Sequence, residues 1–190
     1  MYRRIAIVGG NGSGKTTLGK RLAEAMGYPH LDIEKYFFAE AEIPYQNARS
    51  RDEALSLLRA DLLREETFVL SAVTCDFGAE LEKLYDCVIY LQVPLEIRLK
   101  RVIQRSVDQF GARVAEGGDL YEQEQRFFQK VAASSTDRID RWLERIPAPV
   151  ILMDGTRPVA DQLQILQRRM QETALCCDSK EVHTESILHR

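Results

Sequence analysis

The sequence predicts an α/β fold in three layers, with helices on both faces of a five-stranded parallel sheet. The composition, with 45% hydrophobic and 29% charged residues in a chain of 190, is that of an ordinary globular domain. Short apolar runs alternate along the chain with longer helical segments, which is the order expected of a parallel sheet with crossover helices. Four of the five apolar runs are uninterrupted, and strands of this kind are buried on both faces.

The first half of the chain supplies two strands and two helices. The short apolar run of residues 5–8 is ended by glycines and predicts a buried strand. A helix is expected over residues 16–26, followed by a second short strand over residues 30–33. Leucines recur at helical spacing over residues 52–65, which predicts an amphipathic helix.

The second half continues the alternation. Residues 67–73 and 87–93 are rich in β-branched and apolar residues and predict two further strands. A helix is expected over residues 95–105, and residues 150–153 predict the last strand. Pro158 stands at a position that favours the first turn of a final helix.

Three segments depart from this alternation. Residues 106–118 contain glycines and little apolar periodicity, which predicts a small mobile lid. A long polar helical stretch is expected over residues 120–146. We assign residues 1–173 to one domain and predict that residues 174–190 form a flexible, polar tail.

Charge, apolar run length and cysteine spacing limit the classes of function. The net charge of −3 gives no basic footprint for nucleic acid. No apolar run approaches the length of a membrane span, so a cytoplasmic protein is expected. Either a monomer or a homodimer is expected. Cys75, Cys87, Cys176 and Cys177 lack metal-ligand spacing and are expected to be reduced thiols.

The strongest motif lies between the first strand and the first helix. Residues 9–16, Gly-Gly-Asn-Gly-Ser-Gly-Lys-Thr, match the P-loop pattern G-x-x-x-x-G-K-[ST]. The glycines let backbone N–H groups approach phosphate oxygens, and the start of the helix presents further N–H groups. Lys15 adds a charge beside the β- and γ-phosphates, and the Thr16 hydroxyl is a ligand for Mg²⁺. The residues expected to bind the nucleotide, Mg-ATP, are Gly9, Asn11, Gly12, Ser13, Gly14, Lys15, Thr16 and Thr17.

Carboxylates follow two of the predicted strands. Asp32 ends the second strand, at the sheet edge where ligands bind in parallel sheets. It is a candidate to hold Mg²⁺ with Thr16 or to accept the proton of an attacking hydroxyl. The alternative is that Asp32 caps the next helix, and the two roles are compatible. Glu34 and Asp76 are candidates to contact an acceptor, although Asp76 is equally suited to capping its loop.

Arginines are concentrated after the fourth strand. Arg98, Arg101 and Arg105 share one face of the predicted helix, and Arg113 lies within the predicted lid. Phosphoryl transfer relies on cations near the phosphate oxygens, so Arg101, Arg105 and Arg113 are candidate catalytic residues. The alternative is a solvated basic face paired with acids such as Glu96.

A second set of side chains lies between the second strand and the helix of residues 52–65. Arg49 and Arg51 are candidates to grip an anionic acceptor, or else they are surface charges that flank the helix. The aromatic residues Tyr36-Phe37-Phe38 and Tyr45 suggest an acceptor pocket, but such a cluster more often belongs to the core.

Several motifs together resemble the nucleoside and nucleotide kinase-like P-loop family, which includes adenylate and shikimate kinases. They are the P-loop, Asp32, the arginine helix with its flap, and residues 154–158, Asp-Gly-Thr-Arg-Pro. The resemblance covers residues 2–170. It implies a five-stranded parallel sheet, a lid at residues 106–118 and phosphoryl transfer from ATP. It also implies that Thr156 and Arg157 lie in the loop that contacts adenine, with Arg105 as a further nucleotide ligand.

The match to individual members of the family is partial. Asp32-Ile33-Glu34 looks like the Asp-x-Asp of shikimate kinases, with Glu34 in place of the second Asp. The glycine triplet that helps these kinases bind shikimate is replaced by Cys75-Asp76-Phe77-Gly78. The resemblance therefore implies a reaction class and leaves the acceptor open.

Two main hypotheses follow. The first is a phosphotransferase that moves the γ-phosphate of Mg-ATP to a small hydroxyl- or phosphate-bearing acceptor, such as a nucleoside, nucleotide or metabolite. The second is a regulatory ATPase that binds nucleotide and signals to a partner, for which the polar stretch of residues 120–146 is a candidate surface. A weaker third hypothesis is phosphorylation of nucleic-acid ends along the arginine face.

Overall fold

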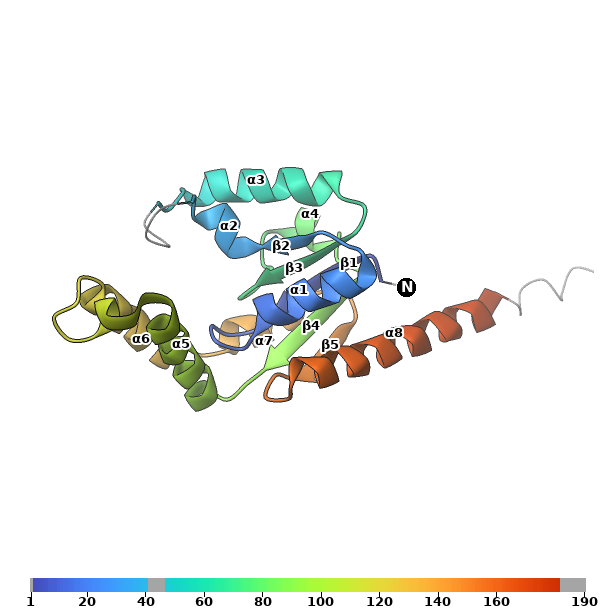
Figure 1. Ribbon diagram of the computed structural model, residues 1–190. Coiled ribbons are helices and arrows are strands. Elements are labelled where there is room, and N and C mark those ends of the chain that lie inside the picture. The colour runs from blue at the N-terminus through green and yellow to red at the C-terminus, as the bar shows by residue number, and fades with distance from the viewer. Residues whose placement is uncertain (1, 41–46, 182–190) are drawn as a thin grey trace, which may run out of the picture.

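The sheet is parallel throughout, as predicted. The computed structural model describes residues 2–40 and 47–181, with side chains as far as Met170. Its strands lie in the order β2-β3-β1-β4-β5, and every pair of neighbours is parallel (Figure 1). The strands are β1 (Arg4–Val8), β2 (His30–Asp32), β3 (Phe68–Ala72), β4 (Cys87–Gln92) and β5 (Val150–Asp154).

Helices cover both faces of this sheet and bury two separate sets of side chains. Helices α1 (Lys15–Met26) and α8 (Val159–Glu181) lie on one face, where they pack against residues such as Ile5 and Ile7. Helices α3 (Arg51–Arg64), α4 (Ala79–Glu82) and α7 (Asp137–Leu143) lie on the other. Because side chains alternate along a strand, Ala6 and Val8 of β1 face this second set. The apolar runs are therefore uninterrupted because helices bury both faces of each central strand.

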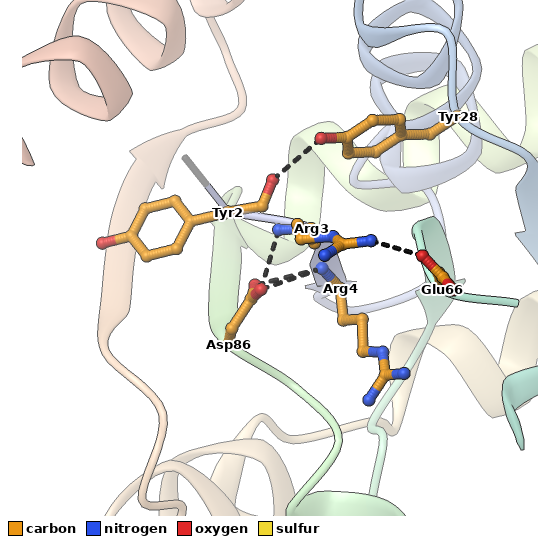
Figure 2. A network of polar contacts seen from close by, with 6 residues as sticks. All are labelled: Tyr2, Arg3, Arg4, Tyr28, Glu66 and Asp86. Atoms are coloured by element: carbon orange, nitrogen blue, oxygen red, sulfur yellow. Dashed lines mark hydrogen bonds and ion pairs between the residues drawn. The ribbon is translucent and has the colours of Figure 1, made fainter. Parts of the chain in front are cut away.

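The amino-terminal edge of the sheet is joined by polar contacts. Asp86 accepts hydrogen bonds from the backbone N–H groups of Arg3, at 2.7 Å, and Arg4, at 3.1 Å (Figure 2). The Arg3 guanidinium pairs with Glu66 at 2.7 Å, and the Tyr28 hydroxyl donates to the Tyr2 carbonyl at 3.3 Å. These contacts hold the start of β1 against its neighbours. The candidate site lies at the opposite, carboxyl-terminal edge of the sheet.

The predicted lid segment is folded differently from the expectation. Helix α5 runs from Leu95 to Phe110 instead of ending at residue 105, and a 3₁₀ turn, η1 (Gly111–Val114), follows it. The helix continues because Ser106 is buried and donates a hydrogen bond to Glu124. This buried polar pair contributes nothing to the apolar periodicity, so the pattern did not show that the helix extends so far.

The predicted polar stretch is two helices rather than one. Helix α6 (Tyr121–Ala132) packs beside α5, and the pair projects from the sheet (Figure 1). Helix α7 packs on the sheet through Ile139 and Trp142, which are 2% and 1% exposed. A short helix, α2 (Ile33–Phe37), begins where the second strand was expected to end.

The remaining expectations concern the carboxyl-terminal end, the thiols and the membrane. Helix α8 continues to Glu181, past the start of the predicted tail at residue 174, and residues 182–190 lie outside the described part of the chain. Cys75 and Cys87 are buried free thiols, while the side chains of Cys176 and Cys177 are not among those described. No helix within residues 2–40 and 47–181 is long and apolar enough to cross a bilayer.

Candidate active site

The P-loop connects β1 to α1 with the backbone that the motif requires. Gly12 and Gly14 have φ angles of 80° and 97°, in the left-handed region that glycine favours. A Cβ atom on Gly12 would in addition overlap the backbone carbonyl of Arg98. Gly14 is the N-cap of α1. The helix start therefore has no side-chain cap, and it has no acidic residue in its first turn, the arrangement found where a helix start binds phosphate.

Lys15 is the charged group at the centre of this loop. Its Nζ donates to the Gly10 carbonyl oxygen at 3.0 Å, so the side chain folds back over the loop. Desolvation lowers the pKa of Lys15 to about 8, and the carboxylates of Glu34 and Asp32 partly oppose this shift. A bound polyphosphate would add negative charge to that of these two carboxylates and further favour the charged form of Lys15.

One cavity brings most of the predicted site residues together. It has a volume of about 260 Å³ and lies between the P-loop, the ends of β2 and β3, and helix α5. We call it the phosphate cavity, after the ligand that the P-loop motif predicts. Its size suits a polyphosphate group rather than a whole nucleotide. The predicted residues that line it are Asn11, Gly12, Gly14, Lys15, Thr16, Thr17, Asp32, Glu34, Arg101 and Arg105.

Asp32 has both of the features considered for it. It is 8% exposed and lines the phosphate cavity at the end of β2. Its Oδ1 also accepts a hydrogen bond from the Glu34 backbone N–H at 3.1 Å, which caps α2. Capping fixes the carboxylate in the cavity, so the structural role supports the placement that a functional role needs.

The residues present fit a magnesium ion held mainly by its substrate. Mg²⁺ in phosphate sites takes one or two protein oxygen ligands, together with phosphate oxygens and water. Thr16 and Asp32 supply a hydroxyl and a carboxylate oxygen in the same cavity. Among the described residues there is no cluster of three or more His, Cys, Asp and Glu side chains that would form a protein-only cage.

Two arginines of α5 line the cavity as predicted. Arg101 Nη1 donates to the carbonyl oxygen of Gly155 at 3.0 Å and to that of Ser13 at 3.4 Å. It thereby joins the P-loop to the loop that follows β5. Arg105 lies one turn further along α5 and is exposed at the cavity wall.

Arg98, which sequence reasoning placed on the same face, is a buried support for the P-loop. It is 3% exposed, and its guanidinium donates to the carbonyl oxygens of Val93, at 3.2 Å, and Asn11, at 3.4 Å. A Cβ atom on Gly10 would overlap the Arg98 guanidinium. The spacing of Arg98 and Arg101 was the available sequence signal, but it did not distinguish an arginine beneath the loop from one beside the phosphates.

Four of the predicted catalytic and acceptor-binding residues do not line the phosphate cavity. Arg113 pairs with Asp119 at 2.6 Å within the folded segment after α5. Arg49 donates to the carbonyl oxygens of Lys35, at 3.0 Å, and Tyr36, at 2.9 Å. The other two are Asp76, which pairs with Arg145 at 2.6 Å, and Arg51, which is the exposed first residue of α3. Acceptor binding by Arg49, Arg51 and Asp76 stays a prediction, and the contacts of Arg49 and Asp76 give each of these two side chains a structural role in the folded chain.

The remaining predicted nucleotide ligands lie around the loop rather than in this cavity. The Gly9 backbone N–H donates to Val73 at 3.2 Å. Ser13 is 1% exposed, and its Oγ has no hydrogen-bond partner among the described residues. Thr156 donates through its backbone N–H and its hydroxyl to Asp154, at 2.9 and 2.6 Å, and Arg157 lies 3.5 Å from the same carboxylate. The expectation that Thr156 and Arg157 contact adenine stays a prediction.

The strand, the glycine loop and the helix start with its lysine and threonine define a P-loop protein. Similarity to known proteins places it in the kinase-like class. The chain matches a family model described as an AAA domain over residues 5–116, more than half of its length, and belongs to that family.

Similar proteins extend over more of the chain. YqaC of Bacillus subtilis (strain 168), an uncharacterised protein, is 29% identical over 171 residues, which cover 86% of this chain and 94% of YqaC. A shikimate kinase of Enterococcus faecalis is 29% identical over 157 residues, which cover 75% of this chain and 92% of that enzyme. The structure of a gluconokinase from Sinorhizobium meliloti 1021 has a TM-score of 0.55 and 16% identity, covers 97% of each chain, and supports the fold.

Proposed function

We propose that this protein is a kinase that transfers the γ-phosphoryl group of Mg-ATP to a small hydroxyl- or phosphate-bearing acceptor. The observation that carries the proposal is the phosphate cavity, which gathers the P-loop, Lys15, Asp32, Arg101 and Arg105. The names of the relatives, a shikimate kinase and a gluconokinase, support a small-molecule acceptor. Because ATP is a cytoplasmic substrate, the proposal also implies a cytoplasmic location.

The P-loop residues would hold the phosphates before the reaction. Backbone N–H groups at the start of α1 and the Lys15 ammonium would contact the β- and γ-phosphate oxygens. The Thr16 hydroxyl would hold Mg²⁺ directly and the Asp32 carboxylate would hold it through water, which leaves the carboxylate able to accept a proton. The ion would neutralise phosphate charge. This arrangement would place the terminal phosphorus in the cavity that Glu34 and Arg105 also line.

The transfer step needs a proton acceptor and cations. The oxygen of the acceptor hydroxyl forms a bond to the γ-phosphorus while the bond from that phosphorus to the bridging oxygen breaks. ADP leaves with the electron pair, and the hydroxyl proton passes to a carboxylate, for which Asp32 is the candidate. Arg101 and Arg105 would neutralise the charge on the transferred group.

A catalytic role for Arg113 needs closure of the segment that carries it. The exposed ion pair between Arg113 and Asp119 would have to open first. Exposed pairs of this kind contribute only about 0–1 kcal/mol, so the pair is a small barrier to such a movement. Lid closure therefore stays part of the proposal.

The test is ATP turnover, measured as ADP release, with and without a panel of nucleosides, nucleotides, polyols and hydroxy acids. Turnover should rise with at least one acceptor. Replacing the point charge of Lys15 in Lys15→Met should lower it by about a hundredfold or more, as for a lost transition-state contact. The matched control is Lys20→Met, an exposed lysine on the same helix. Slow hydrolysis that no acceptor changes, together with nucleotide-dependent binding to another protein, would favour the regulatory ATPase instead.

A further inference from the structure

A second cavity adjoins the phosphate cavity. It has a volume of about 440 Å³ and lies between the end of α2 and the projecting pair α5 and α6. Asn11, Glu34 and Arg105 line both cavities. A molecule in the second cavity would therefore lie directly beside the phosphate chain bound in the first.

Aromatic rings from three elements line this second cavity. Phe38 follows α2, Phe110 ends α5, and Phe127 lies in the middle of α6. Each of the three is partly exposed rather than packed into the main core. Flat aromatic faces at a cavity wall favour a planar, aromatic occupant, which gains by stacking on them. The aromatic residues that the sequence assigned either to the core or to an acceptor pocket are thus divided. Tyr36 is buried in the core and Phe37 packs against it, whereas Phe38 lines a cavity and Tyr45 lies outside the described residues.

Uncharged polar side chains line the same cavity as the rings. The amides of Asn11, Gln109 and Gln123 line the same cavity, and each offers both donors and an acceptor. Glu124 is 6% exposed and lines it as well, with one oxygen held by the Ser106 hydroxyl at 2.5 Å. Amides and a fixed carboxylate suit the mixed donors and acceptors of a heterocycle edge.

The charges of this cavity do not favour an acid as its occupant. Its cations, Arg105 and Lys130, are matched by its carboxylates, Glu34 and Glu124. The two arginines that were expected to grip an anionic acceptor, Arg49 and Arg51, line neither cavity. A carboxylic acid would therefore meet as much negative as positive charge here.

We propose that the second cavity is the acceptor site of this kinase and that it selects a hydroxyl-bearing molecule built on a neutral, planar heteroaromatic ring, as a nucleoside is. The inference rests on the proposed function for the chemistry but not for the binding. The ring stacks among Phe38, Phe110 and Phe127, and the amides contact its edge. The hydroxyl of the acceptor lies toward Glu34 and Arg105, which line both cavities, and so toward the terminal phosphate of the nucleotide.

Binding without turnover tests the cavity separately from catalysis. Isothermal titration of the full chain, with ADP and Mg²⁺ present, compares adenosine, guanosine, cytidine, uridine and thymidine with gluconate and shikimate. At least one nucleoside should bind, and the two acids should not. Phe127→Ala should weaken nucleoside binding about tenfold or more, the effect of removing one stacking partner. ADP affinity should stay unchanged.

A matched control is next to the tested residue. Phe128 is also a half-buried phenylalanine of α6, but it does not line the cavity, so Phe128→Ala should leave nucleoside binding unchanged. If Phe127→Ala melts at a lower temperature than Phe128→Ala, Gln123→Ala provides a second test that removes no apolar packing.

The outcomes separate this inference from the proposed kinase activity. Nucleoside binding that Phe127→Ala or Gln123→Ala weakens and Phe128→Ala does not would support the cavity assignment, even if no phosphoryl transfer followed. Phosphorylation of gluconate, shikimate or another non-aromatic acceptor, with no nucleoside binding, would overturn the assignment and leave the kinase in place. Nucleoside binding that is insensitive to both cavity variants would also overturn it.

Discussion

Lys15 shows how a single side chain is set for an anionic ligand. Its ammonium is desolvated within the P-loop and satisfied only in part, by the Gly10 carbonyl at 3.0 Å. A desolvated cation is raised in free energy relative to one in water. A phosphate that binds in the loop offsets this penalty. The relief of the penalty therefore contributes to the free energy of phosphate binding.

Affinity for nucleotide should fall as the pH rises through about 8, the value to which desolvation lowers the pKa of Lys15. Below this pH the lysine is charged and attracts phosphate, and above it the neutral amine does not. The dissociation constant of Mg-ADP should then increase by up to about tenfold per pH unit. Titration calorimetry between pH 7 and pH 9.5 measures this slope.

Two lysine variants make the pH test specific. Lys15→Met should bind weakly at every pH without the slope, whereas Lys20→Met, on the exposed side of the same helix, should keep it. A wild-type affinity that is flat across this range would contradict the assignment of Lys15 as the titrating phosphate ligand.

Arg98 illustrates a limit of reading side chains from spacing. Its spacing from Arg101 and Arg105 places all three toward the P-loop, but depth separates their roles. Arg98 is buried and satisfies the carbonyl oxygens of Val93 and Asn11, so it supports the loop from beneath. Only Arg101 and Arg105 reach the phosphate cavity.

Helix α1 makes a close contact with the sheet at Gly19. Gly19 faces β2 and β3, and a Cβ atom there would lie 2.6 Å from His30 Nε2 and overlap Ser71 Oγ. His30 and Ser71 are themselves hydrogen-bonded at 3.0 Å, and Ser71 Oγ donates to the Lys15 carbonyl at 3.2 Å. This cluster ties the first turn of α1, and with it the phosphate loop, to the sheet.

Gly19→Ala should lower the free energy of unfolding by about 1–3 kcal/mol, because the added methyl group overpacks this contact. The expected sign opposes helix propensity, by which alanine is favoured over glycine by about 1 kcal/mol. Urea denaturation measures the change, with Ala25→Gly at an exposed position of α1 as a measure of propensity alone. A Gly19→Ala protein as stable as the parent would mean that α1 lies further from β3 than described.

Helices α5 and α6 show where periodicity misled the prediction. Residues 106–110 were assigned to a mobile lid because they lack apolar repeats, yet they complete α5. The contact that holds them is polar, between Ser106 and the buried Glu124. Hydrophobic patterns register apolar burial only, so a helix fastened by a buried hydrogen bond was read as a loop.

In the whole molecule, the stabilising polar contacts and the candidate site lie at opposite edges of the sheet. The amino-terminal edge is joined by Asp86 to the backbone of Arg3 and Arg4 (Figure 2). The carboxyl-terminal edge carries the phosphate loop, Asp32 and the cavities. A change at one end should therefore alter stability without altering ligand binding.

Mg-ATP at about a hundred times its dissociation constant should stabilise the chain by about 2.7 kcal/mol. For a protein of this size that corresponds to a rise in Tm of about 5–10 °C. Thermal denaturation followed with and without ligand measures the shift. Lys15→Met should abolish it, whereas Asp86→Ala should lower Tm but keep the shift. Loss of the shift in Asp86→Ala would contradict the separation of the two ends.

Local chemistry alone was sufficient to predict the parallel sheet, the P-loop and the placement of Asp32, Arg101 and Arg105. Uninterrupted apolar runs report burial on both faces, and the glycine-lysine-threonine motif specifies its own backbone geometry. Long-range packing decided the rest: the burial of Arg98, the partners of Arg49 and Asp76, and the aromatic cavity beside the phosphate cavity. These features join residues far apart in the chain, and spacing along a sequence carries no information on which distant groups fold together.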